Sequence, residues 1–167
     1  MGTKPNTKPG CLSFLLTLFN FSQKEEISYP YLLRDSILSK NELAFYHSLS
    51  HVVGSKFVIL SKVRLSDIFL PQHGKGYYAA LNRINPRHVD FLLVDPNTFK
   101  PILGIELDDR SHSRPDRQER DDFVNGLYDA MNLPLLHMPA KHGYEVNEIK
   151  QGIVTTIREN QSKHNSV

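Results

Sequence analysis

Two short apolar segments of the chain carry acidic side chains whose spacing suggests metal chemistry. HVDFLLVD (88–95) contains Asp90, and ILGIELDD (102–109) contains Glu106 and Asp108. Three carboxylates held close together repel one another, and burying them unpaired costs several kcal/mol or shifts their pKa values strongly. A divalent cation removes that conflict, and Mg²⁺ is commonly held by one or two carboxylates together with water and a phosphate.

A hairpin would bring these carboxylates together. The two apolar segments predict neighbouring strands joined by the turn PNTFK (96–100). One register places Asp90 opposite Glu106, and a shift of two residues places it opposite Asp108. Either register keeps all three side chains on one face, because side-chain direction repeats every two residues along a strand. The alternative to a metal ion is neutralisation by arginines that are near in sequence, namely Arg87, Arg110, Arg114 and Arg117.

The remaining elements follow from capping signals and periodicity. Ser39 and Glu42 have the S-x-x-E spacing of a capping box, which predicts the start of a helix that Gly54 ends. Further along, the pattern predicts one or two extended pieces over 56–69, a loop over 71–78, strands over 88–95, 102–109 and 133–140, and helices from Pro115 and Asn147. A helix between the third and fourth strands implies a parallel, right-handed crossover. The fold class is therefore α/β, a mixed sheet flanked by helices.

Composition limits the class of protein. The chain has 167 residues, a net charge of +2 and a pI of about 8.6, which suits one soluble domain and permits nucleic-acid binding without arguing for it. Its single cysteine, Cys11, excludes a disulfide framework and a four-cysteine zinc finger. A cytoplasmic location is the expectation.

The chain divides by composition into three parts. Residues 1–28 are expected to be a flexible leader, 29–160 a single domain, and 161–167 a disordered tail. Within the leader, CLSFLLTLFNF (11–21) is apolar but about half as long as a bilayer span requires. It is interpreted as a segment that docks on the domain or a protein partner, with a membrane-proximal role as the alternative.

The acidic pattern resembles a known superfamily. Asp90, Glu106 and Asp108 give D-x15-E-x-D, preceded by a helix that bears Glu42, and this resembles the PD-(D/E)-x-K nucleases with their restriction-endonuclease-like αβββαβ core. VDFLLVD, GIELDDRSH and NLPLL, with PYLLRDSILSKNELAFYHSL, VRLSDIF and ALNRINPRHVDF, are similar to a bacterial domain family of unknown function. In other proteins that domain is often joined to a topoisomerase-type zinc finger. The resemblance covers roughly residues 30–145 and extends to patch-repair endonucleases, which share an E-x-D-x-x-x-H pattern.

The resemblance implies a function and roles for the matching residues. It implies an endonuclease that hydrolyses DNA phosphodiester bonds with Mg²⁺ or Mn²⁺. Asp90 and Glu106 would hold the metal ion, with Asp108 as an additional ligand or as the partner of a histidine. Glu42 would reach the site from the first helix; the alternative is a purely capping role at Ser39.

One departure from the superfamily bears on activity. The superfamily's lysine, two residues after the glutamate, is here Asp108. His112 is the candidate for proton transfer, and Lys62, Arg64 or Arg87 could supply the missing positive charge. The departure leaves a second function open, a catalytically inactive nucleic-acid-binding module on the same fold.

Basic residues around the proposed site suggest phosphate contacts. The candidates are Lys75, Arg83, Arg87, Arg110, Arg114, Arg117 and Arg120. Tyr77 and Tyr78 could stack on a base or pack a loop. His137, on the fourth strand, is expected to be a core residue.

Overall fold

The computed structural model describes residues 29–108 and 115–164, with the side chains of residues 115–117 excepted. Two compact units are present, Met1–Asp35 and Ser36–Val167, and all regular secondary structure of the described residues lies in the second. The expected leader, including the apolar segment 11–21, lies outside the described residues. The last helix runs to His164, so residues 161–164 are helical and do not belong to the predicted disordered tail.

The order of elements agrees with the predicted helix, three strands, helix, strand, helix. The elements are α2 (Lys40–Val53), β1 (Val58–Arg64), α3 (Leu65–Ile68), α4 (Tyr77–Ile84), β2 (His88–Val94), β3 (Pro101–Asp108), α5 (Pro115–Ala130), β4 (Leu135–Pro139) and α6 (Val146–His164). Two short helices, α3 and α4, were not predicted. Helix α3 occupies the end of the segment expected to be extended, and α4 begins within the last two residues of the predicted loop and continues beyond it.

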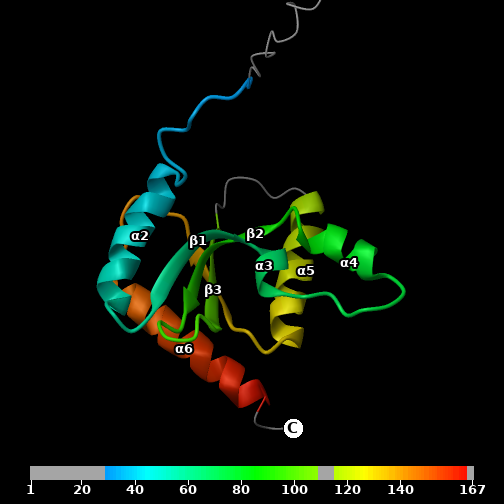
Figure 1. Ribbon diagram of the computed structural model, residues 1–167. Helices are drawn as coiled ribbons and strands as arrows, with labels where there is room; N and C mark the ends of the chain where they lie inside the picture. Colours follow the sequence, from blue (N-terminus) through cyan, green and yellow to red (C-terminus); the bar gives the residue numbers. More distant parts are fainter. Residues whose placement is uncertain (1–28, 109–114, 165–167) are drawn as a thin grey trace, which may run out of the picture. The chain divides into compact units, whose positions relative to one another are not determined.

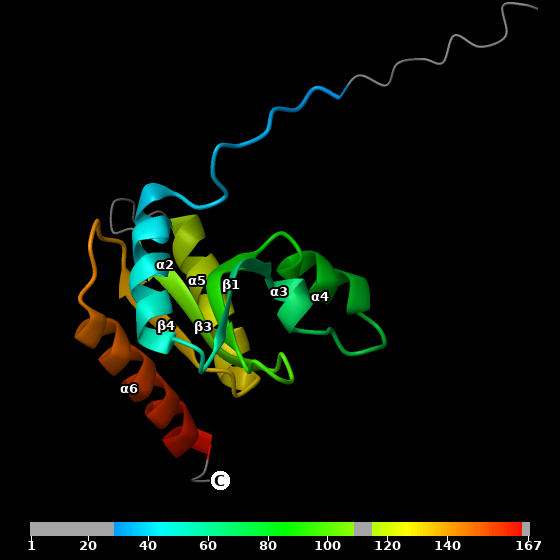
Figure 2. The ribbon, with the colours of Figure 1, turned by 60° about the vertical axis from the view of Figure 1, so that its left-hand side comes forward.

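One mixed sheet organises the second unit. Its strand order is β1-β2-β3-β4; β1–β2 and β2–β3 are antiparallel, whereas β3–β4 is parallel. The predicted α/β class and the parallel crossover through α5 are confirmed. Helices α2 and α6 cover one face of the sheet, and α3, α4 and α5 lie on the other (Figures 1 and 2).

The two faces bury separate apolar clusters. Phe45, Leu49 and Ile149 from α2 and α6 pack on one face against strand residues such as Phe91 and Ile105. The other face buries a cluster with residues from α3, α4, the strands and α5, including Leu65, Ile84, Leu92, Val124 and Tyr128. The sheet is thus held between two helical layers. Polar side chains on its strands therefore lie close to apolar clusters.

Close packing of α5 on the sheet depends on Gly104 of β3. A Cβ atom at this position would lie 2.6 Å from Cε1 and 2.9 Å from the hydroxyl oxygen of Tyr128. Tyr128 is 1% exposed, and its hydroxyl has no hydrogen-bond partner among the described residues. Burial raises the pKa of this hydroxyl above its ordinary value. Only glycine lets the ring lie this close to the strand.

The regular alternation of β1 breaks at Lys62, whose φ is 55°. Before it, Ile59 packs with the α2 and α6 cluster and Leu60 with the opposite cluster; after it, Val63 joins Leu60. Ile59 and Val63, four residues apart, therefore pack on opposite faces of the sheet, although a regular strand would place them on the same face. A left-handed backbone is costly for a residue with a Cβ, on the order of 1 kcal/mol, so Lys62 is held there by its surroundings.

Candidate functional site

A cavity of about 480 Å³ lies at the junction of β2, β3 and β4 with α5. Four of the predicted catalytic residues line it, Glu42, Asp90, Glu106 and Asp108, and so does Arg87. The other lining residues are His88, Leu107, Arg120, Asp121, Val124, Asn125 and His137. The sheet therefore brings the predicted carboxylates to one cavity.

Strand register explains this convergence. Phe91 pairs with Ile105, which puts Asp90 opposite Glu106, the first of the two predicted registers. The same row continues on both sides, because β1 pairs with β2 so that Lys62 lies opposite Asp90, and Glu106 pairs with His137 of β4. One polar side chain from each strand thus lies in a single row across the sheet, Lys62, Asp90, Glu106 and His137.

Asp90 is buried, with 9% of its surface exposed, and each carboxylate oxygen has a donor. Oδ1 accepts a hydrogen bond from Lys62 Nζ at 2.9 Å, and Oδ2 accepts one from the backbone N–H of Leu107 at 2.9 Å. The second bond joins β2 to β3 through a side chain. Both bonds fix the orientation of the Asp90 carboxylate toward the cavity wall.

Glu42 combines the two roles that the sequence left as alternatives. Oε2 accepts a hydrogen bond from the Ser39 N–H at 2.7 Å, and the Glu42 N–H donates to Ser39 Oγ, which completes the capping box. Oε1 accepts a hydrogen bond from Lys62 Nζ. Partial burial acts to raise the pKa of Glu42, but the bonds from Lys62 and Ser39 outweigh it and lower the pKa below its ordinary value.

Lys62 is the cation that accompanies the carboxylates, among the three that the sequence offered. Its ammonium bonds both Glu42 and Asp90. Burial acts to lower the pKa of Lys62, but those two carboxylates raise it above its ordinary value, so the side chain stays charged. Arg64 instead pairs with Asp67 at 3.2 Å on the surface.

Glu106 differs from its neighbours because its carboxylate makes no hydrogen bond or ion pair within the described part of the chain. Burial, followed by the charge of Asp90, raises its pKa to about 8, while Arg120 acts in the opposite direction. Arg120 itself lies 3.8 Å from Asp121. Glu106 is therefore a partly buried acid whose ionised form has no hydrogen-bond or ion-pair partner among the described residues.

Asp108 belongs to a second polar group on the same cavity. His137 Nδ1 lies 3.1 and 3.2 Å from the two Asp108 carboxylate oxygens, and its Nε2 lies 2.8 Å from Asn125 Oδ1. The histidine is not a core residue as expected; its side chain is 37% exposed. Its position could have been found from the sequence, because the parallel crossover sets β4 beside β3 with His137 next to Glu106.

The donor set fits a cation held by two carboxylates better than one held by three. Among residues 29–108 and 118–164, no group of three or more Asp, Glu, His or Cys side chains is arranged to hold a metal ion. Asp108 is paired with His137, so the three predicted ligands do not form one group. Asp90 and the unpartnered Glu106 remain adjacent in the cavity, and two carboxylates completed by water and phosphate oxygens suit Mg²⁺.

The basic residues that were predicted to contact phosphate lie in different parts of the structure. Arg87 lines the site cavity, Arg83 lines a separate groove, and Lys75 is exposed in the loop before α4. Arg120 also lines the site cavity. Outside the described residues lie His112, Arg110, Arg114 and the side chain of Arg117.

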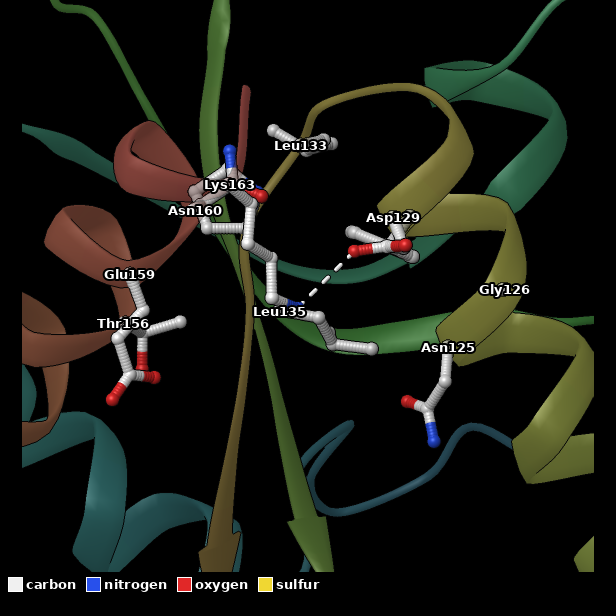
Figure 3. Close-up of a pocket in the computed structure, with 11 residues that line it drawn as sticks. Asn125, Gly126, Asp129, Leu133, Leu135, Thr156, Glu159, Asn160 and Lys163 are labelled. Carbon is white, nitrogen blue, oxygen red and sulfur yellow. Dashed lines mark hydrogen bonds and ion pairs between the residues drawn. The ribbon is translucent and has the colours of Figure 1, made fainter. Parts of the chain in front are cut away.

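A second cavity, of about 430 Å³, lies between the end of α5, the start of β4 and α6 (Figure 3). Lys163 of α6 forms an ion pair of 3.4 Å with Asp129 of α5 across it, as the dashed line marks. No predicted site residue that the structure describes lines this cavity, and Asn125 alone is common to both. It is therefore distinct from the candidate site.

Fold and site together define a mixed α/β domain with an acidic cavity at one end of its sheet. Residues 34–157, well over half of the chain, match the family described as protein of unknown function (DUF2726), and the chain belongs to that family. No curated protein and no solved structure matches the chain. None of the helices in the described ranges combines the length and apolar character that crossing a membrane requires.

Proposed function

We propose that this chain is a divalent-metal-dependent nuclease that hydrolyses DNA phosphodiester bonds on a restriction-endonuclease-like core. The element order, with three antiparallel strands and a parallel fourth strand after α5, supports that core. The acidic residues at the positions that match the superfamily, Asp90 and Glu106, lie opposite each other and line one cavity.

The observation that carries the proposal is that Glu106, beside Asp90 in the cavity, has no partner for its ionised form within the described ranges. A buried carboxyl group usually has a partner, since an unpaired one costs free energy. Here the nearest strand neighbour is a second carboxylate, Asp90, which raises the Glu106 pKa further. A dication held by both carboxylates would compensate their charges, whereas the arrangement does not favour the stability of the fold by itself.

Each residue of the site has a role under this proposal. When bound, Mg²⁺ or Mn²⁺ lowers the pKa of a water molecule and stabilises negative charge on the reacting phosphate. Asp90 and Glu106 would hold the ion, and Lys62 fixes the Asp90 carboxylate. The Lys62 ammonium also adds the positive charge that the superfamily places where this chain has Asp108. Arg87 and Arg120 line the cavity and suit the phosphate oxygens.

A catalytically inactive nucleic-acid-binding module is the second candidate, and two observations favour it. Lys62 already donates to Asp90, and a pKa of about 8 keeps Glu106 protonated at neutral pH. Together these features neutralise the pair with no metal ion. The two candidate functions differ in whether adding dications leads to DNA cleavage.

A cleavage panel separates them. Plasmid, linear duplex and single-stranded DNA are incubated with the full chain in Mg²⁺ or Mn²⁺, and products are resolved on gels. Asp90→Asn and Glu106→Gln are expected to lose about 10²-fold or more in rate, the loss typical of removing a charge-stabilising group. Glu159→Gln, on the surface of α6, is the matched control and should cleave normally. Cleavage that both site variants retain rejects the site, and DNA binding without cleavage in either metal supports the inactive module.

A further inference from the structure

The surface around α4 has a charge distribution unlike the rest of the chain. From Ile68 to Val89 the sequence contains Lys75, Arg83 and Arg87 but no aspartate or glutamate. None of these three cations forms an ion pair with a carboxylate in the described ranges. The chain as a whole has 20 basic and 18 acidic residues, so this local excess of positive charge favours an anionic partner.

The same surface contains a groove that is larger than either of the two cavities described above. This α4 groove has a volume of about 880 Å³, and its walls come from the segment after α3, from α4 and from α5. Apolar side chains dominate it, and two stand open to solvent, Leu70 (78% exposed) and Met131 (55% exposed). Its only charged lining residues are Arg83 and Lys100. An apolar floor with a cationic rim suits a ligand that combines flat apolar rings with negative charge.

Aromatic rings stand at the start of α4. His73 and Tyr77 are stacked in parallel, with ring centroids 5.6 Å apart and 2° between their planes, and Tyr78 meets Tyr77 edge to face at 5.4 Å. Tyr78 is 77% exposed. Both tyrosines begin helix α4. The Tyr77 ring packs on His73 of the preceding loop, whereas Tyr78 presents its ring to solvent. Unpaired bases stack on such rings without sequence preference.

A pair of arginines connects the α4 groove to the candidate site. The guanidinium groups of Arg83 and Arg87 lie over the same Phe123 ring, 3.9 and 5.3 Å from its centroid, and Arg87 donates a hydrogen bond to the Arg83 carbonyl. Arg83 and Phe123 line the groove, whereas Arg87 lines the site cavity. The cations thus form a continuous path from the carboxylates to the groove, the path that a phosphate backbone could follow.

We propose that the α4 groove, with the rings of His73, Tyr77 and Tyr78, binds the unpaired nucleotides of a single-stranded nucleic acid whose backbone runs over Arg83 and Arg87. The inference rests on the proposed function for the placement of the reacting phosphate, but the binding itself requires no catalysis. A duplex keeps its bases stacked on one another, so it cannot use the rings or the apolar floor. The surface therefore selects strand form.

Binding without metal tests the inference. Fluorescence anisotropy in EDTA measures the affinity of the full chain for a labelled thymidine oligonucleotide, a uridine oligonucleotide of equal length and a DNA hairpin duplex. The single strands are expected to bind more tightly than the duplex. Tyr78→Ala is expected to weaken single-strand binding at least about fivefold, the lower end of the range for loss of one stacked base. Arg83→Gln should reduce the slope of log affinity against log salt by about 0.7, one phosphate contact on a single strand.

Matched variants identify the surface. Tyr31→Ala removes a tyrosine that is 79% exposed and lies outside the second unit, and Arg158→Gln removes an exposed arginine of α6. Both should bind as wild type does, whereas Met131→Glu, at the groove mouth, should weaken binding. Equal affinity for hairpin and single strands, or equal losses in variants and controls, overturns the inference. Asp90→Asn tests the proposed function separately, because it should abolish cleavage and leave this binding unchanged. Comparison of the thymidine and uridine oligonucleotides shows whether the groove distinguishes DNA from RNA.

Discussion

Replacing Glu106 with glutamine should stabilise the chain at alkaline pH and leave its stability nearly unchanged at acid pH. The folded chain holds the Glu106 proton until about pH 8, whereas the unfolded chain releases it near 4.5. Between those values the unfolded state binds fewer protons, so the free energy of unfolding falls as pH rises. The stability associated with this group is fully present below about pH 4.5 and is lost by pH 8. Glutamine has no proton to release and therefore avoids the loss.

The size of the effect follows from the same two values. At 1.36 kcal/mol for each pKa unit, their difference corresponds to about 5 kcal/mol. Side-chain rearrangement and water entry reduce the cost of a buried charge, and we expect a gain of about 2 kcal/mol or more at pH 8.5. At pH 5 the expected difference is within about 0.5 kcal/mol.

Urea unfolding in EDTA, at half-unit steps from pH 5 to pH 8.5, provides the measurement. The chain has no tryptophan, so far-UV circular dichroism is the suitable signal. Comparison of variant and wild type at each pH removes the contribution of all other titrating groups. The control variant Glu159→Gln makes the same substitution at an exposed position, so its difference in stability from wild type should not change with pH. A Glu106→Gln variant that is less stable than wild type at pH 8.5, or a stability difference that stays constant with pH, refutes the inference that ionised Glu106 lacks a partner.

Two further predictions concern the parts that position the site. Lys62→Met should lower the free energy of unfolding at pH 7 by about 2 kcal/mol, because it leaves the buried Asp90 carboxylate without its cation; Lys56→Met, at an exposed position, should change it little, and equal effects of the two would contradict the role of the ion pair. Gly104→Ala should cost about 1–3 kcal/mol in urea unfolding, since its methyl group meets the Tyr128 ring, whereas Gly126→Ala, with open space around it on α5, should be neutral or stabilising.

The sequence predicted the elements whose signals are local and strong. The Ser39–Glu42 capping box begins α2 as expected, and Gly54, with φ 53°, ends it. The period-two pattern of the two apolar segments and the short turn between them were enough to place Asp90, Glu106 and Asp108 on one face of the sheet. A one-residue slip was excluded, because it would move every buried side chain to the wrong face. The two-residue shift was not excluded by the sequence, and only the structure shows that Asp90 lies opposite Glu106.

Features without a local signal were missed. Helix α3 has four residues, too few for a periodic pattern, and α4 begins after Gly76 (φ 100°) with no side-chain cap. The sequence did not show that Lys62, among the three candidate cations, accompanies the carboxylates. Lys62 adopts a positive φ, which the sequence does not reveal for a lysine. His137 was assigned to the core because its neighbours are apolar, although an exposed edge strand can place alternate residues toward solvent.

The distribution of polarity across the sheet argues that the site was kept for function. The row Lys62, Asp90, Glu106 and His137 carries a charged or titratable group on every strand. The preceding row on the same face consists of Leu60, Leu92, Gly104 and Leu135, and contains no polar side chain. The left-handed backbone of Lys62 and the Glu106 carboxyl, whose ionised form has no partner among the described residues, both fall in the polar row. An apolar side chain at position 106 would remove the second cost and continue the core. Two destabilising features in one row, at one cavity, are therefore better explained by the proposed ligand than by the fold.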